Sequence, residues 1–266
     1  MSQRYEKLFD SLKKKNEGAF IPFVMLGDPG LEESEAIIET LIESGADALE
    51  LGIPFSDPVA DGPVIQASAN RALERNVTPD ECLDLAAGIR AKLTKNAKNA
   101  DIPMGLLVYA NLVLGKGLRR FYVRAAESGI DSALVADVPT GASGPFVRCA
   151  QEAGIAPVFI VPPNADDGKL REIAGLTKGY AYFLGRAGVT GADREMISPV
   201  SSKITLLKDA GSPPVVVGFG ISRPEHVRAC LDAGADGAIS GSATVAIIAD
   251  NLGDAKKTRQ ELSRFV

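Results

Sequence analysis

Residues 43–52 read Glu-Ser-Gly-Ala-Asp-Ala-Leu-Glu-Leu-Gly, and they contain the unit that decides the fold. A helical pattern ends at Gly45, where a left-handed backbone is available to glycine without steric cost, and an apolar run follows at once. The same helix–glycine–strand order recurs at residues 127–131, 152–155 and 232–236. Convergent helix capping is an alternative explanation of the repeat. In either case, repeated passage from helix to strand predicts parallel strands joined by helices.

Strand-like runs and helical patterns alternate from one end of the chain to the other. The strands are expected at residues 20–26, 48–53, 104–109, 132–136, 156–160, 180–184, 214–217 and 237–240. Helices are expected at residues 31–44, 79–93, 118–128, 144–153, 199–209 and 224–233, with two more beginning at Thr244 and Ala255. An opening amphipathic helix directs Tyr5, Leu8, Phe9 and Leu12 inward.

Eight such units in 266 residues match the usual size of a (β/α)₈ barrel. The expected fold is therefore α/β, a TIM barrel with an extra N-terminal helix, and residues 1–266 are expected to form a single domain. An open doubly wound sheet is the alternative. Its dinucleotide-binding form requires G-x-G-x-x-G after the first strand, and residues 26–30, Leu-Gly-Asp-Pro-Gly, lack that spacing.

Composition excludes several classes of protein. The net charge of −5 argues against binding nucleic acid through a general basic field, although backbone amides could still hold a phosphate. The polar N-terminus is unlike a secretory signal, and no stretch approaches the roughly 20 apolar residues of a membrane span. Cys82, Cys149 and Cys230 are scattered, which favours buried reduced thiols and a cytoplasmic protein. With His226 as the single histidine, we expect no metal site.

Glu50 is the leading candidate for a catalytic residue. Strand alternation places Ala48, Glu50 and Gly52 on one face, while Leu49 and Leu51 point to the helices. A carboxyl group in an apolar interior has a raised pKa, which suits a general acid. The alternative is a buried ion pair, but no other expected strand core carries Lys or Arg.

Asp61 offers a second carboxylate in the loop that follows the same strand, residues 54–63. If it stays ionised, it could stabilise a cation while Glu50 moves a proton. A helix cap or turn acceptor before Pro63 is the alternative. Asp57 is more typical of a turn or an interface.

Glycines follow three late strands, at residues 185–191, 218–220 and 241. The loops after strands seven and eight form the usual phosphate site of such barrels, because small residues let backbone amides approach an anion. Tight turns alone are the alternative explanation. The first of these segments, Gly185-Arg186-Ala187-Gly188-Val189-Thr190-Gly191, is a candidate lid over the barrel mouth.

These motifs together resemble the tryptophan synthase alpha chain family, in order and at matching spacing from the first helix to nearly the last residue. They are L-G-D-P-G, A-L-E-L-G, P-F-S-D-P-V-A-D-G-P, Y-A-N, P-P-N-A-D-D, G-V-T-G, G-F-G-I-S and G-A-I-S-G-S-A. The resemblance implies the retro-aldol cleavage of indole-3-glycerol phosphate to indole and glyceraldehyde 3-phosphate. Another phosphate-binding barrel lyase or isomerase, or a non-catalytic activator of a beta chain, remains an alternative.

The resemblance also implies roles for individual residues. Glu50 would be the acid and base at C3 of the indole ring, Asp61 would hold the indole N–H, and Tyr182 would lie beside Glu50. Thr190 would close toward Asp61. Phosphate would bind at Gly191, Gly218, Phe219, Gly220, Gly241 and Ser242. The apolar walls would be Phe23, Ile65, Leu107, Leu134, Ala136, Ile160, Phe219 and Ile239.

A beta-chain partner follows from the same resemblance. The implied assembly is an α₂β₂ heterotetramer in which the beta chain holds pyridoxal phosphate and uses the indole, so that this chain needs no cofactor. Pro54, Asp57, Pro58 and Asn111 would meet the partner. The chain departs from the family at residues 185–187, where Gly-Arg-Ala replaces the Ser-Arg-Ser of many relatives. Loss of two hydroxyls there puts lid closure and the response to the partner in doubt.

Overall fold

A computed structural model describes residues 3–96, 99–185, 194–218 and 220–266, with the backbone alone for residues 194–199. The strands are β1 (Ala19–Met25), β2 (Leu49–Gly52), β3 (Met104–Val108), β4 (Ser132–Val135), β5 (Ala156–Val158), β6 (Ile160–Val161), β7 (Ala181–Leu184), β8 (Val215–Gly218) and β9 (Gly237–Ser240). The helices are α1 (Gln3–Lys15), α2 (Leu31–Ser44), α3 (Pro63–Glu74), α4 (Pro79–Lys95), α5 (Ala110–Gly115), α6 (Leu118–Glu127), α7 (Gly144–Glu152), α8 (Asp167–Leu176), α9 (Arg194–Asp209), α10 (Pro224–Asp232), α11 (Ser242–Asp250) and α12 (Ala255–Phe265), with a 3₁₀ turn at Thr140–Ala142.

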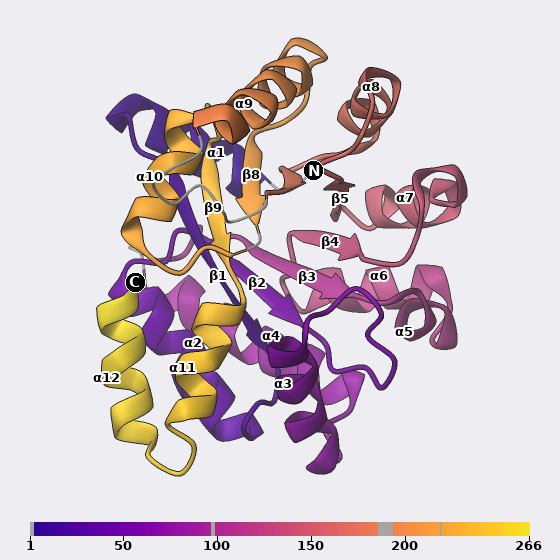
Figure 1. The fold of residues 1–266 in the computed structure, drawn as a ribbon. Helices are drawn as coiled ribbons and strands as arrows, with labels where there is room; N and C mark the ends of the chain where they lie inside the picture. The colour runs from indigo at the N-terminus through magenta and orange to yellow at the C-terminus, as the bar shows by residue number, and fades with distance from the viewer. Residues whose placement is uncertain (1–2, 97–98, 186–193, 219) are drawn as a thin grey trace.

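The strands form one parallel sheet in the order β5-β4-β3-β2-β1-β9-β8-β7-β6. Figure 1 labels the part of this order from β5 to β8. Its two outermost strands, β5 and β6, are separated in sequence by Phe159 alone. The Phe159 N–H donates to Thr177 Oγ1 at 2.9 Å, and this side-chain bond interrupts the strand. The interrupted strand pairs with β4 on one side and with β7 on the other, which closes the sheet into the expected (β/α)₈ barrel.

The helix–glycine–strand prediction is confirmed at all four positions. Gly45, Gly129, Gly154 and Gly234 each have a positive φ, between 77° and 114°. Each therefore ends its helix in the left-handed conformation that only glycine adopts readily. These turns send the chain back into the sheet with a short connection, and so they fix the repeat of the barrel.

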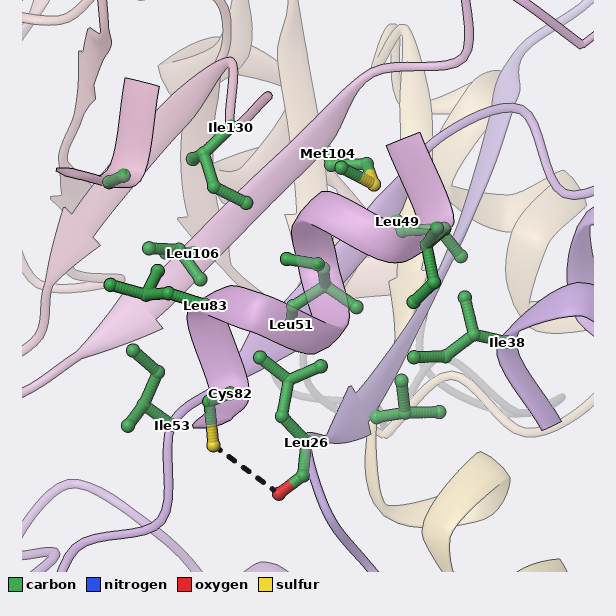
Figure 2. Close-up of a cluster of buried hydrophobic side chains, with 14 of the residues drawn as sticks. Leu26, Ile38, Leu49, Leu51, Ile53, Cys82, Leu83, Met104, Leu106 and Ile130 are labelled. Carbon is green, nitrogen blue, oxygen red and sulfur yellow. Dashed lines mark hydrogen bonds between the residues drawn. The ribbon is translucent and has the colours of Figure 1, made fainter. Parts of the chain in front are cut away.

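The outer core lies between the sheet and its helices. Leu49 and Leu51 point out of β2 toward Leu83 of α4 and Ile38 of α2, as strand alternation predicts (Figure 2). The three cysteines are free thiols on helices, as expected. Cys82 is buried as predicted, whereas Cys149 and Cys230 are only half-buried. Among the described residues, no helix combines the length and apolar character needed to cross a membrane.

The inner core fills the barrel itself. Tyr5, Phe9 and Leu12 of α1 pack against its interior side chains at the amino ends of the strands. Tyr5 Oη lies 2.9 Å from Ser132 Oγ, and its ring lies 5.4 Å from that of Tyr180. The N-terminal helix therefore closes one end of the barrel, and the other end is left for a site.

Three helices escape the sequence patterns: α3, α5 and α8. α5 has six residues and is too short to show helical periodicity. α3 begins with Pro63 at its first position and buries only a narrow stripe of mostly small residues, Ile65, Ser68, Ala69 and Ala72. Its weak apolar face explains why the pattern was missed.

Candidate active site

Glu50 is buried inside the barrel, with 2% of its surface exposed. It is the second residue of β2 and is in register with Phe23 of β1 and Gly105 of β3. The Tyr180 hydroxyl donates to Glu50 Oε1 at 3.2 Å. Burial raises the pKa of Glu50 to about 8, and the nearby charge of Asp61 adds to the rise. Among the described residues no Lys or Arg pairs with Glu50, so the alternative of a buried ion pair finds no support there.

Asp61 is half-buried in the loop between β2 and α3. Burial raises the pKa of its carboxyl group, and a hydrogen bond from Tyr109 opposes the rise. The cap of α3 is Gly62, with no side-chain cap hydrogen bond, so the Asp61 carboxylate does not cap that helix. The charge of Asp61 acts on Glu50 through space, which places the two acids close enough to influence each other. Two carboxyl groups in unlike surroundings can take different roles in proton transfer.

Apolar side chains surround Glu50. Phe23, Leu134 and Ile239 project from separate strands into the inner core, and Ile65 reaches it from α3. The remaining described wall residues, Leu107, Ala136 and Ile160, are half-buried in the same cluster. Tyr182, which was predicted to lie beside Glu50, is half-buried there too. The structure therefore brings together the described residues that were predicted to line an indole pocket, whereas Phe219 lies outside the described residues.

Small residues lie at the carboxyl ends of β8 and β9. Gly218 ends β8, and a Cβ there would lie 2.2 Å from Tyr182 Oη, so any larger residue would force the Tyr182 side chain to move. Gly241 caps α11 and Ser242 is its first residue. Ser240 Oγ donates to the Ile221 carbonyl at 2.7 Å and ties the loop after β8 to β9. A helix N-terminus beside glycine turns supplies the amides and positive dipole end that attract an anion.

Part of the predicted site lies beyond the residues that the structure describes. Thr190, Gly191 and Phe219 lie outside the described residues, as does the predicted lid from residue 186 onward. Gly185 is described and buried, and its N–H donates to the Gly218 carbonyl at 3.0 Å. The last described residue before the predicted lid thus lies against the end of β8.

The predicted partner positions differ in exposure. Asp57 and Asn111 are exposed, Pro58 is half-buried and Pro54 is buried. Next to Pro58, Val59 leaves 81% of its side chain in solvent. The exposed part of this set lies on the loop after β2 and on α5, and Tyr109 connects these two segments.

Several site residues were not predicted from the sequence. Tyr180 precedes β7 and lies two residues before Tyr182, so strand alternation could have identified it. Asp28, 2% exposed, receives two hydrogen bonds from Arg71, Nε at 2.8 Å and Nη2 at 2.6 Å. Ser68 Oγ also donates to Asp28, and together these bonds hold α3 against the loop after β1. No local pattern signals such a contact.

The described residues contain no group of three or more His, Cys, Asp or Glu side chains arranged to hold a metal ion. A parallel barrel with one acid buried in its interior and a second acid in the loop after the same strand is typical of (β/α)₈-barrel enzymes of the acid–base type.

Comparison with known proteins identifies the family. The family described as tryptophan synthase alpha chain matches residues 9–266. The alpha chain of Escherichia coli O17:K52:H18 is 53% identical over 264 residues, which are 99% of this chain and 96% of that relative. That of Shigella dysenteriae serotype 1 shows the same 53% identity and coverage. The chain therefore belongs to the tryptophan synthase alpha chain family.

Solved structures agree. Tryptophan synthase subunit alpha from Legionella pneumophila str. Paris superposes with a TM-score of 0.85 at 28% identity, covering 98% of this chain and 95% of that one. A chain of the tryptophan synthase a2b2 complex from Pyrococcus furiosus gives a TM-score of 0.81 at 34% identity, with 93% and 96% covered. As a member of this family the chain is a lyase that performs the alpha reaction, the retro-aldol cleavage of indole-3-glycerol phosphate to indole and glyceraldehyde 3-phosphate.

Proposed function

We propose that Glu50 and Asp61 carry out this cleavage. Neutral Glu50 gives its proton to C3 of the indole ring, and the ionised Asp61 stabilises the resulting cation at the ring N–H. Glu50 then takes the proton of the glycerol hydroxyl as the bond from C3 to the glycerol carbon breaks. The hydroxyl carbon becomes the aldehyde of glyceraldehyde 3-phosphate, indole leaves, and Glu50 is again protonated. The observation that supports this proposal best is the burial of Glu50 inside the barrel, which raises its pKa to about 8 and so keeps the acid neutral before the reaction at neutral pH.

The remaining predicted residues bind the substrate in this proposal. The indole ring lies among the apolar walls of the inner core, with Tyr182 beside Glu50. Phosphate binds the amides at Gly218, Gly220, Gly241 and Ser242, and from the undescribed part also at Gly191 and Phe219. Thr190 closes over the site. Protonation at C3 turns the ring into a good leaving group, so the mechanism requires neither a metal nor an organic cofactor of this chain.

We also propose that the chain works in an α₂β₂ complex with a tryptophan synthase beta chain. The complex from Pyrococcus furiosus supports the assembly. Asp57, Pro58 and Asn111 contact the partner, and the buried Pro54 shapes the loop behind them. Pyridoxal phosphate belongs to the beta chain, which uses the indole.

Residues 1–266 form a single domain in this proposal, which the continuous sheet supports. A cytoplasmic location is supported by the three free cysteines, since a reducing compartment keeps thiols unpaired.

The test is indole formation from indole-3-glycerol phosphate, with and without a beta chain. We expect Glu50→Gln to fold normally and to lose at least about 10²-fold in kcat. Glu127→Gln, at the exposed end of α6, is the matched control and should retain wild-type activity. Undiminished turnover in Glu50→Gln would refute the acid–base assignment. A wild-type chain that stimulates a beta chain but forms no indole would instead be a non-catalytic activator.

A further inference from the structure

Tyr109 is buried at a position where the barrel normally carries functional groups. It follows β3 directly, caps the start of α5, and leaves only 2% of its surface exposed. Its ring stacks on that of Phe55, with the centroids 5.2 Å apart and 25° between the ring planes. Phe55 belongs to the loop between β2 and α3, so the stack joins the ends of two neighbouring strands.

The Tyr109 hydroxyl contacts the same loop at two further points. The Ala60 N–H donates to Tyr109 Oη at 3.1 Å. The hydroxyl proton remains available to donate, and the Asp61 carboxylate is its acceptor. One hydroxyl therefore fixes both the backbone before Asp61 and the carboxylate of Asp61.

The backbone around Tyr109 leads to the partner-facing surface. The Tyr109 carbonyl accepts from the Leu112 N–H at 3.1 Å and begins α5. The next residue, Ala110, donates its N–H to Asp137 Oδ1 at 2.7 Å, which anchors α5 to the loop after β4. The residue after that is the exposed Asn111. Asn111 therefore lies only two residues along the chain from Tyr109, and the Tyr109 side chain contacts the Asp61 carboxylate.

We propose that Tyr109 is a positioning residue for the cleavage: it fixes Asp61 in the site and connects it to α5, the helix that carries Asn111. The inference rests on the proposed function of Asp61 and deepens it. Contact of a beta chain with α5 would then act on Asp61 through the Tyr109 hydroxyl.

The charged groups around Asp61 leave its ionised form dependent on the Tyr109 hydroxyl. Among the described residues, the titratable groups that face Asp61 and Tyr109 are Glu50 of β2, Tyr182 of β7 and Asp137 after β4. None of these is a cation. The Tyr109 hydroxyl is therefore the described group that favours the ionised form of Asp61, and its bond lowers the pKa of that acid.

Tyr109→Phe tests the proposal, because it keeps the ring and its stack but removes the hydroxyl. We expect kcat/KM for indole formation without the partner to fall about 10- to 100-fold, as for loss of a hydrogen bond to a charged group. The acid limb of the pH profile should move to higher pH, because Asp61 loses the donor that lowers its pKa. Stimulation by a beta chain should also be smaller than in the wild type.

Two further variants separate positioning from structural damage. Tyr122→Phe removes the hydroxyl of a buried tyrosine on α6, in the outer core, and should leave the rate and pH profile unchanged. Phe55→Leu removes the stack but keeps the hydroxyl, and should shift the acid limb less than Tyr109→Phe. Circular dichroism tests whether each variant is folded.

The outcomes are distinguishable. A wild-type rate and pH profile in Tyr109→Phe, with Glu50→Gln inactive, would overturn the positioning role and leave the proposed function standing. Undiminished stimulation by the beta chain in Tyr109→Phe would overturn the connection through α5. Failure of the wild-type chain to form indole would instead overturn the proposed function itself.

Discussion

The burial of Glu50 connects its protonation to the stability of the fold. Its pKa is about 8 in the folded chain and 4.5 ordinarily, so between these pH values the folded state holds a proton that the unfolded state has lost. The stability due to the neutral form is complete below about pH 4.5, declines up to about pH 8 and is constant above. Glu50→Gln should therefore gain stability over the wild type across this window, by up to a few kcal/mol. Urea unfolding at about pH 5 and about pH 9 measures the difference.

Glu127→Gln serves as the control for this prediction, because it makes the same change from carboxyl to amide at an exposed position. If the stability gain of Glu50→Gln were equal at low and high pH, Glu50 would not be buried in its neutral form.

Asp61 should affect the protonation of its neighbour. Its charge contributes to the raised pKa of Glu50, so Asp61→Asn should lower that pKa. Since neutral Glu50 is the active form in the proposed mechanism, the residual activity of Asp61→Asn should be lost at a lower pH than that of the wild type. The alkaline limb of the kcat/KM profile measures this shift, and a limb that moved to higher pH would contradict the coupling.

At the scale of the elements, Asp131 joins α1, α4 and β3 just before β4 begins. Its carboxylate accepts from Arg4 at 2.9 Å, from Arg90 at 2.8 Å and from the Met104 N–H at 2.9 Å. Asp131 and Arg90 are both buried. Asp131→Ala leaves the buried guanidinium of Arg90 without its carboxylate partner. We expect this substitution to lower the free energy of unfolding by about 3–5 kcal/mol. Chemical denaturation provides the measurement.

The exposed pair of Lys7 with Asp101 is the matched comparison, because it also ties α1 to the amino end of the barrel. Asp101→Ala should lower stability by less than about 1 kcal/mol, as solvent screens an exposed pair. Similar losses in the two variants would show that the burial of Asp131 does not determine its contribution.

At the scale of the whole molecule, the loop after β2 exposes an apolar residue, as expected of a surface that a partner chain covers. Val59 is 81% exposed beside Asp57. Val59→Asp should weaken binding of a beta chain about tenfold, while cleavage without the partner stays near the wild-type rate. Titration calorimetry with the beta chain measures the affinity.

Val123→Asp, on the outer face of α6, changes another exposed valine and should leave the affinity unchanged. Equal weakening by both variants would indicate a general effect of added charge instead of a contact at Val59.

Local patterns were sufficient for some elements but not for all, since α8 was not predicted although it buries Leu170, Ile173 and Ala174 on one face. α2 was predicted with the bounds that the structure shows, because its apolar spacing and the Gly45 turn are both written in consecutive residues. α5 and the interruption at Phe159 were not predictable. The first is too short for periodicity, and the second depends on the side chain of Thr177, which is distant in sequence.

The sequence by itself determined the barrel and the inward position of Glu50, because helix capping and strand alternation act between neighbouring residues. It also determined the family, through motifs preserved in order along the chain. Only the tertiary structure decided which groups touch the two acids. The Tyr180 hydroxyl reaches Glu50 across 130 residues of sequence, and Tyr109 reaches Asp61 from the next strand of the barrel. Such contacts need the folded barrel: pairing of β2 with β3 brings Tyr109 to Asp61, and closure of the sheet brings Tyr180 to Glu50 from a strand that is not its neighbour.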